Sequence, residues 1–374
     1  MKNSISILHT EWSDGWGGQE IRIISEMVAI RNQGMNVFLA CRDHSIIKHK
    51  AKEKNIEVFT LGFKGNADIK TLFNLIKIIN ANNINIVNTH SGKDTWVGGI
   101  AAKLTKAKFI RTRHLSTPIK TSRLNFINEF ADFIITTGET VKSNMIRDNR
   151  IIPNKIKSIP TGIDTHIFNP NRYDKKNCLD YFKLTDNQIL IGALGVLRTF
   201  KRHDRFLLMA RYVINQNPNK KIHFFLAGDG PLSQNLHHRI KEMGLSNHIT
   251  MLGHVNNVAR FLKILDIFVL TSDSGEGVPQ SLAQALFMQT AVVSTNAGSS
   301  KDLYNNNNFL LINKDSQVEI NEACNQLVNN VDLCNMYAHN SRKFALENFS
   351  INKMTKKILK IYSDLNENEN ENKN

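Results

Sequence analysis

Residues 266–287 read DIFVLTSDSGEGVPQSLAQALF. The first part is an apolar run that predicts a buried strand, and the last part carries apolar residues at helical spacing. Between them lie small polar residues, Glu276, Gly277 and Pro279. Proline is favoured at the start of a helix, so the stretch predicts a strand, a glycine loop and a helix in that order. This is the repeating unit of parallel α/β sheets.

The same alternation runs through both halves of the chain. We expect strands at 4–9, 36–41, 56–60, 85–89, 108–112 and 132–137, and again at 188–193, 222–227, 249–252, 266–270, 291–294 and 309–312. We expect helices at 18–33, 68–82 and 139–148, and three closing helices at 316–330, 332–347 and 351–364. Because the strands are short and apolar throughout, the pattern predicts two parallel sheets with helices on both faces.

A linker candidate divides the two halves. Residues 160–177 contain two prolines, a glycine and many polar side chains. We therefore predict an α/β protein with two doubly wound domains, 1–165 and 166–348, facing a central cleft. Residues 349–365 are expected to form a C-terminal helix that could return to the first domain, and 366–374 a disordered tail of Asn, Glu and Lys. Ligands of such sheets bind at the carboxyl ends of the strands.

The charge of the chain is unevenly distributed. The net charge is +15, and residues 1–165 carry 24 Lys or Arg against 14 Asp or Glu. No acid lies between Asp94 and Glu129, a segment that contains Lys103, Lys106, Lys108, Arg111, Arg113, Lys120 and Arg123. A basic half favours an anionic partner, which could be a phosphorylated lipid, a membrane surface or nucleic acid. Solvated lysines in a generally basic proteome explain the same pattern equally well.

The composition disfavours a membrane-spanning protein, a disulfide-bonded protein and a metal-binding protein. No segment approaches the roughly 18 uncharged apolar residues of a membrane span. The four cysteines form no CxxC pair and the 13 histidines are scattered, so we expect reduced thiols, no metal site and a cytoplasmic protein.

Polar loops follow the strands of the second half. After Gly195, Arg198 and Lys201 could bind a diphosphate, although a solvated helix start has the same pattern. Glu276 and the helix start after it favour a phosphate ligand, and Gln284 lies two turns further along, within reach of a ribose. Alternatively, Glu276 merely caps the helix. A further loop of small residues, TNAGSS, follows at 295–300.

The first half has a comparable loop, EWSDGWGGQE at 11–20. Gly17 and Gly18 at a helix start suit an anion, but the loop lacks the GxGxxG pattern, so no nicotinamide or flavin cofactor is expected. Trp16, like Trp12, is either a packing anchor or a stacking platform for a sugar. His90 and His114 both end predicted strands and are candidates for the site.

These motifs together resemble glycosyltransferase family 4, the retaining glycosyl transferases of group 1 with the GT-B fold of two Rossmann-like domains. The mark of that family, Glu-x7-Glu, reads Glu276-x7-Gln284 here. The resemblance implies that Glu276 meets donor-sugar hydroxyls and that Gln284 meets the ribose. The backbone that touches the diphosphate would be that of Gly277, Val278 and Pro279.

The chain departs from the family at two places. Gln284 replaces the second acid, which puts nucleotide affinity in doubt, and Val196 stands where the family often has arginine. We therefore assign the phosphate contact to Arg198 and Lys201. His114 matches the first-domain histidine near the reacting centre, with His90 as its competitor.

The resemblance implies a metal-independent enzyme without a cofactor, which moves a sugar from a nucleoside-diphosphate sugar with retention of configuration. The expected acceptor is lipopolysaccharide core or another lipid-linked or oligosaccharide cell-surface glycan, as in bacterial lipopolysaccharide and polysaccharide transferases. Segments 103–123 and 124–130 would lie on the anionic inner face of the cytoplasmic membrane. The alternatives are an epimerase of the same fold, which needs more cleft carboxylates, and a nucleic-acid-binding protein. No nucleic-acid module appears, so no nucleic-acid partner is expected.

Overall fold

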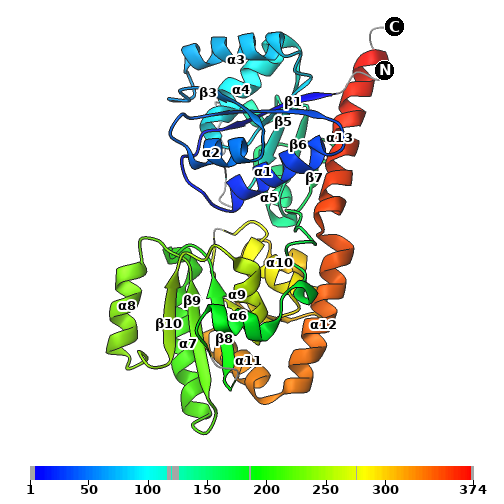
Figure 1. Ribbon diagram of the computed structural model, residues 1–374. Helices are drawn as coiled ribbons and strands as arrows, with labels where there is room; N and C mark the ends of the chain where they lie inside the picture. Colours follow the sequence, from blue (N-terminus) through cyan, green and yellow to red (C-terminus); the bar gives the residue numbers. More distant parts are fainter. Residues whose placement is uncertain (1–4, 116–118, 120–125, 185–186, 275, 372–374) are drawn as a thin grey trace. The chain divides into compact units, whose positions relative to one another are not determined.

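The computed structural model describes residues 5–115, 119, 126–184, 187–274 and 276–371. The chain forms two compact units (Figure 1). Unit 1 comprises Met1–Gly162 and Ile351–Asn374, and unit 2 comprises Ile163–Ser350. The boundary between the two units follows Gly162, three residues before 165, the predicted end of the first domain.

Unit 1 is built on a seven-stranded parallel sheet in the order β3-β2-β1-β4-β5-β6-β7. Its strands are β1 Ser6–Glu11, β2 Asn36–Cys41, β3 Glu57–Thr60, β4 Ile86–Thr89, β5 Lys108–Arg113, β6 Phe133–Thr136 and β7 Ile156–Ser158. Its helices are α1 Gly18–Arg31, α2 Ile46–Glu53, α3 Ile69–Ala81, α4 Gly92–Thr105, α5 Glu139–Asn149 and α13 Ile351–Glu371.

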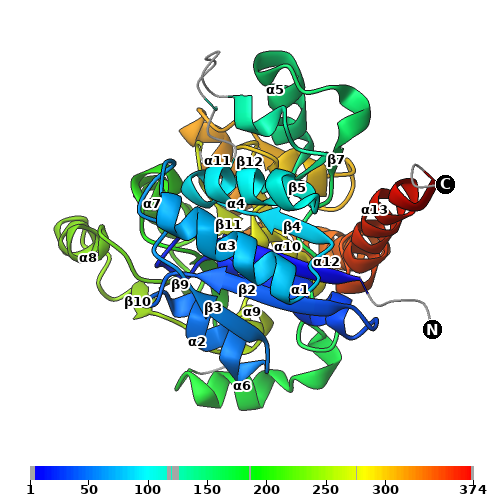
Figure 2. The same cartoon turned by 90° about the horizontal axis from the view of Figure 1, so that it is seen from above.

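Alternate residues of each central strand face opposite layers of helices. Ile7 of β1 packs with α1, α2 and α13, whereas the next residue, Leu8, packs with α3, α4 and α5. On the second face α3 and α4 lie side by side (Figure 2). Both faces are therefore covered, which explains why the strands are apolar throughout.

Unit 2 repeats this architecture with six strands in the order β10-β9-β8-β11-β12-β13. Its strands are β8 Ile189–Leu194, β9 Ile222–Ala227, β10 Ile249–Gly253, β11 Ile267–Leu270, β12 Ala291–Thr295 and β13 Leu310–Ile312. Its helices are α6 Lys175–Tyr181, α7 His203–Gln216, α8 Ser233–Glu242, α9 Val258–Ile264, α10 Gln280–Phe287, α11 Gln317–Asn329 and α12 Val331–Asn348. The cleft expected between the two domains stays a prediction.

Three helices, α2, α4 and α6, and one strand, β7, were absent from the sequence prediction. α4 contains Gly98 and Gly99, which lower helix propensity and hide the helical pattern. A Cβ on Gly99 would lie 2.7 Å from the ring of Phe109 in β5, so the glycines let this helix approach the sheet closely. α2 was missed because it is short and charged, and β7 because it has only three residues.

The end of the chain corrects one expectation. The predicted tail at 366–374 begins inside α13, which continues to Glu371; residues 372–374 lie outside the described part. The earlier turns of α13 pack against α1. Once a helix has formed, each residue that extends it gains one backbone hydrogen bond, so the helix can continue into a polar segment. α13 is shown in red in Figure 1 and belongs to unit 1. No helix among the described residues is long and apolar enough to cross a membrane.

Candidate functional site

Lys201 and Glu276 meet at the carboxyl edge of the unit 2 sheet. Lys201 ends a short 3-10 helix, Thr199–Lys201, after β8, and Glu276 lies in the loop after β11. Lys201 Nζ lies 2.5 Å from Glu276 Oε1, and Ser272 Oγ donates a hydrogen bond of 2.6 Å to the same oxygen. Both charged side chains are largely buried, with 13% and 9% exposed. β8 and β11 are neighbours at the point where the strand order reverses, which is where such sheets bind ligands.

Three loops are tied together around this pair. The Thr271 hydroxyl donates to the backbone oxygens of Lys201 and Arg202 at 2.9 and 3.0 Å, and the Thr295 hydroxyl donates to that of Ser272 at 2.5 Å. Gly298 has φ +57°, and a Cβ there would lie 2.1 Å from the backbone oxygen of Glu276. Only glycine permits this approach, so the loop after β12 holds the carboxylate in place.

Arg202, and not Arg198, takes part in the ionic network beside this pair. Its guanidinium pairs with both oxygens of Asp204 at 3.0 and 2.9 Å and with Asp273 at 3.0 Å. The hydrogen bonds that Arg202 donates to Asp204, and then to Asp273, raise the pKa of its guanidinium. Arg198 is exposed, and its guanidinium makes no hydrogen bond or ion pair within the described part of the chain. The assignment of phosphate binding to Arg198 therefore has no structural support beyond its place in the loop.

The start of α10 completes the unit 2 site. Pro279 is its N-cap, and no described side chain caps the helix. The carboxylate of Glu276 is directed to Lys201 and Ser272, so Glu276 does not act as the helix cap that the sequence left as an alternative. Val278 packs in the core, and Gln284 is half-buried one turn into the helix. Because helix N-termini favour negative charge, this end of α10 suits an anion.

In unit 1, one pattern recurs on three neighbouring strands. β1 contains Ile7-x-His9-x-Glu11. β4 and the residue after it read Ile86-x-Asn88-x-His90, and β5 and the residue after it read Ile110-x-Thr112-x-His114. The three isoleucines belong to the same core cluster as α1 and α13. Because side chains alternate along a strand, the polar residues two and four positions later lie on that same face.

This pattern brings three histidines together. His9 Nδ1 lies 2.9 Å from His90 Nε2, and His90 Nδ1 lies 2.9 Å from His114 Nε2. The rings of His9 and His90 are stacked, with an interplanar angle of 8°. Burial lowers the pKa of His9 to about 3 and holds the pKa values of His90 and His114 well below the ordinary range. The two predicted histidines, His90 and His114, are therefore members of one cluster.

A second buried cluster surrounds Glu11 at the end of β1. Its carboxylate accepts hydrogen bonds from the amide of Ser13 at 2.7 Å, from Gln19 Nε2 at 2.5 Å and from the hydroxyl of Ser91. Burial and then the charge of Asp94 raise the pKa of Glu11 to about 8. Burial also raises the pKa of Asp94, which accepts from the hydroxyl of Thr10 at 2.7 Å.

The glycine loop of unit 1 lies beside this cluster. Gly17 is the N-cap of α1, and its amide donates to Glu20 Oε2 at 2.8 Å; Gly18 is exposed at the first helical position. Trp16 is half-buried against the core cluster that includes α1, and Trp12 against the cluster on the other face of the sheet. Both tryptophans therefore pack as anchors, while the ring of Trp12 also meets Lys93 Nζ at 4.2 Å.

The basic segment of unit 1 is only partly a surface feature. Arg111 is buried in the sheet, where its guanidinium donates to the backbone oxygen of Thr89 at 3.1 Å. β5 is a central strand covered on both faces, so the side chain of Arg111 cannot reach solvent. Lys103 and Lys106 are exposed, and Lys103 pairs with Asp132 at 2.7 Å. Lys120, Arg123 and Leu124 lie outside the described residues.

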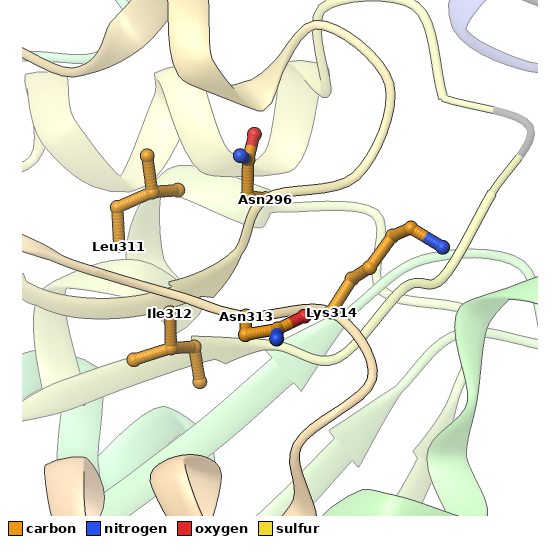
Figure 3. Close-up of a pocket in the computed structure, with 5 residues that line it drawn as sticks. All are labelled: Asn296, Leu311, Ile312, Asn313 and Lys314. Carbon is orange, nitrogen blue, oxygen red and sulfur yellow. The ribbon is translucent and has the colours of Figure 1, made fainter.

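The described residues form no candidate metal cluster, and one pocket lies at the carboxyl edge of the unit 2 sheet. Within the described ranges, no group of three or more His, Cys, Asp or Glu side chains could hold a metal ion. A pocket at the ends of β12 and β13 is lined by Asn296, Leu311, Ile312, Asn313 and Lys314 (Figure 3). It shares the carboxyl edge of the sheet with Glu276 but contains none of the predicted donor-binding residues.

Several residues of the two sites were missed from sequence. His9, Glu11 and Asp94 belong to unit 1, and Ser272, Asp273 and Arg202 to unit 2. The polar residues at every second position of β1, β4 and β5 were the available signal in unit 1. In unit 2 the signal was weaker, because Arg202 and Asp273 come together only through the fold.

Comparison with known families covers most of the chain. A model described as Glycosyltransferase Family 4 matches residues 16–167, and a model described as Glycosyl transferases group 1 matches residues 180–344. The first match lies in unit 1 except for its last five residues, 163–167, and the second lies in unit 2.

Two relatives and one solved structure extend along nearly the whole chain. A UDP-Gal:alpha-D-GlcNAc-diphosphoundecaprenol alpha-1,3-galactosyltransferase of Escherichia coli is 26% identical, covering 97% of this chain and 98% of its own length. The capsular polysaccharide biosynthesis glycosyltransferase CapM of Staphylococcus aureus is 23% identical over 89% of this chain and 91% of its own. The crystal structure of a glycosyltransferase from Rickettsia africae ESF-5 has a TM-score of 0.86 at 20% identity, covering 97% of this chain and 99% of that one. That likeness shows the GT-B fold.

Proposed function

From the premise that this chain belongs to the glycosyltransferases whose family models match its two halves, we propose that it transfers a sugar from a nucleoside-diphosphate sugar to a lipid-linked saccharide. In this proposal unit 2 binds the donor and unit 1 supplies the acceptor side. The product would be a growing cell-surface polysaccharide, and the configuration at the anomeric carbon would be retained.

The observation that carries the proposal is the Lys201–Glu276 pair beside the N-terminus of α10. Lys201 supplies a cation and the N-terminus of α10 supplies backbone N–H donors, and both kinds of group bind a diphosphate. Glu276 keeps Lys201 in place before the donor arrives, and its remaining oxygen is an acceptor suited to sugar hydroxyls. A site of this kind favours a ligand that carries both a phosphate and a sugar.

In the reaction we propose, the bond between the anomeric carbon and the diphosphate oxygen breaks while the acceptor oxygen bonds to the same face of that carbon. The acceptor's proton passes to the leaving diphosphate. Lys201 and the α10 amides would stabilise the negative charge that develops there, the role a metal ion has in other transferases. We therefore propose that neither a metal nor a cofactor is needed.

The acceptor class follows from the relatives. One of them acts, by its name, on a saccharide linked to diphosphoundecaprenol, and another belongs to capsular polysaccharide biosynthesis. An acceptor held by a lipid would bring the protein to a membrane surface. We propose that unit 1 meets this surface through exposed apolar side chains, namely Phe126 and Phe130, whose ring centroids lie 5.2 Å apart, and Leu104, which stands beside Lys103 and Lys106 in the sequence. Cations near an anionic bilayer contribute about 1 kcal/mol each.

The test of donor binding is a thermal-shift panel with UDP, GDP, ADP and CMP sugars, followed by a transfer assay with the donor that binds. A ligand at 100 times its Kd adds about 2.7 kcal/mol of stability. We expect one base to stabilise the protein strongly and the others weakly. If no nucleotide sugar raises the melting temperature of a folded sample, the proposed function is wrong.

The proposed acceptor and the proposed membrane contact are tested in separate experiments. We expect sugar transfer to a synthetic polyprenyl-diphosphate saccharide and co-sedimentation with vesicles rich in phosphatidylglycerol. Phe130→Ser with Lys106→Glu should reduce co-sedimentation, whereas the control Phe73→Ser, which replaces an exposed ring on α3, should not. Transfer to a free oligosaccharide at the same rate, without vesicle binding, would contradict the membrane role alone.

A further inference from the structure

The histidines of unit 1 form one continuous chain of hydrogen bonds. The two contacts use His9 Nδ1 with His90 Nε2, and His90 Nδ1 with His114 Nε2. The chain therefore ends in His9 Nε2 on one side and His114 Nδ1 on the other. His9 Nε2 is buried and has no hydrogen-bond partner within the described part of the chain.

The three rings are neutral near pH 7. Burial is the main cause of their lowered pKa values, and for His90 the two neighbouring histidines add to it. For His114 the charges of Arg22, Arg111 and Arg113 act in the same direction. A neutral imidazole has one N–H donor and one acceptor nitrogen. Both hydrogen bonds of His90 must then run in the same direction along the chain, so the three tautomers are set together.

Only two directions are available, and they differ at the buried end. In the first, every ring carries its proton on Nδ1, and His9 ends with a bare acceptor nitrogen. In the second, every ring carries its proton on Nε2, and His9 ends with a buried N–H that has no acceptor. Orphaned buried N–H groups are rarer in folded proteins than unsatisfied acceptors, which favours the first direction.

We propose that His90, with His9 behind it, is a positioning residue that holds His114 in the tautomer protonated on Nδ1. His114 then presents a hydrogen-bond donor at the carboxyl end of β5, and its other nitrogen is occupied by the Nδ1–H of His90. Its partner would be the oxygen of a sugar hydroxyl of the acceptor. This last point rests on the proposed function, whereas the tautomer itself does not.

The consequence for the reaction is that His114 takes no proton from the acceptor. Its only basic nitrogen accepts the hydrogen bond from His90, so the acceptor's proton passes to the leaving diphosphate, as proposed above. His114 instead holds an oxygen in place, and His90 acts through His114 without touching the substrate.

The first test is variant-free. Nitrogen-15 NMR of the full-length protein labelled in its histidine rings distinguishes a protonated from an unprotonated ring nitrogen. We expect His114 to carry its proton on Nδ1 from pH 6 to pH 8 and not to titrate over that range. A proton on Nε2, or an ordinary titration near pH 6.5, would overturn the proposal whether or not the protein transfers sugar.

Two variants of His90 provide the second test. His90→Phe keeps a ring but breaks the chain, so His114 should populate both tautomers, and kcat should fall about ten-fold, the smaller end of the loss seen when an orienting partner is removed. His90→Asn keeps an N–H near the place of Nδ1, so it should preserve the tautomer and keep kcat within about two-fold. The affinity for the nucleotide sugar should not change in either variant, because the donor site lies in unit 2.

The control is His223→Phe, which removes a half-buried histidine of β9 whose ring bonds to Thr250 at 2.8 Å and takes no part in the chain. It should leave the His114 signals and kcat unchanged. If His90→Phe folds and leaves the His114 tautomer unaltered, or if His90→Asn scrambles it as strongly as phenylalanine does, His90 does not position His114.

Discussion

The carboxyl edges of the two sheets follow the same topology but hold opposite kinds of chemistry. In both units the first strand of the unit lies third in the sheet and the order reverses beside it, at β1 and β4 in unit 1 and at β8 and β11 in unit 2. The edge of unit 2 carries full charges in pairs, Lys201 with Glu276 and Arg202 with Asp273. The edge of unit 1 carries buried groups whose neutral form is favoured. The pKa of Glu11 is raised, and the pKa values of the three histidines are lowered.

The difference indicates how the two edges would treat a ligand. A paired cation can turn to a phosphate, because the carboxylate it leaves can accept hydrogen bonds from the sugar hydroxyls of the same ligand. A buried neutral network gains nothing from a phosphate, but it can bond to hydroxyls, which are neutral as well. The contrast therefore favours the donor diphosphate at unit 2 and a sugar hydroxyl at unit 1.

Among the variants that test this comparison, Glu276→Ala is expected to have the largest effect. If Glu276 bonds to the donor sugar as proposed, losing its carboxylate should lower kcat by about 10²–10³-fold, as for other groups that stabilise a transition state directly. The measurement is transfer of a radiolabelled sugar, with circular dichroism to show that the variant is folded. Glu242→Ala, which removes an exposed carboxylate of α8, should retain full activity. Turnover within two-fold of the wild type in Glu276→Ala would remove Glu276 from the site.

The next effect distinguishes the two cations assigned to the diphosphate. Lys201→Met should weaken binding of the nucleotide diphosphate by about 10–100-fold, since hydrogen bonds to charged groups contribute about 1.5–3 kcal/mol. Arg198→Met should weaken it only a few-fold, because the side chain of Arg198 is exposed and makes no contact in the described structure. Isothermal titration calorimetry gives both values. The reverse order would show that Arg198 moves onto the phosphates when the donor binds.

A stability measurement tests the neutral character of the unit 1 edge. The pKa of Glu11 in the folded protein, about 8, lies above the ordinary value of 4.5, so the folded state holds a proton that the unfolded chain releases. Stability should therefore fall as pH rises from about 4.5 to 8, by up to about 1.4 kcal/mol for each pH unit. Glu11→Gln, which cannot ionise, should flatten this slope and be the more stable protein at pH 8 in urea unfolding.

The histidines have the opposite effect on the pH dependence of stability, at acidic pH. Their folded pKa values lie below 6.5, so the unfolded chain takes up protons that the folded protein does not, and stability should be lost as pH falls below 6.5. The two trends together predict a stability maximum near pH 6.5. A flat profile from pH 5 to pH 8 in the wild type would mean that these groups are solvated and that the contrast between the two edges is smaller than inferred.

The fold was predictable to a large extent from periodicity alone. The strand at 36–41 and the strand at 222–227 were expected with the bounds that β2 and β9 have. One of the unrecognised helices, α4, is buried over most of its length and contains Gly98 and Gly99, so it shows no clear amphipathic stripe. Amphipathic periodicity detects helices with one continuous face towards solvent, which α4 lacks.

The sites were predictable only in part, for a physical reason that separates the two units. Glu276 and Lys201 stand next to glycines and a proline, which mark functional loops in a sequence. His9 and Glu11 lie in a strand that looks like ordinary core, and Asp94 lies in the first turn of α4. Their partners, His90 and Ser91, are about 80 residues away in the chain. Such clusters depend on strand register, and register becomes visible only when neighbouring strands are compared position by position.

The smallest effect is expected at Gln284, where the chain differs from the Glu-x7-Glu pattern. If Gln284 meets the ribose, its amide oxygen accepts a hydrogen bond from a hydroxyl without the charge that would strengthen that bond. Gln284→Glu should therefore keep kcat within about two-fold and tighten nucleotide binding by a few-fold, measured by calorimetry with the nucleoside diphosphate. The same substitution at Gln280, one helical turn earlier, is the matched control and should not tighten binding. Inactivation by Gln284→Glu would mean that the amide group donates a hydrogen bond that no carboxylate can supply, so the unit 2 edge would also depend on a neutral group.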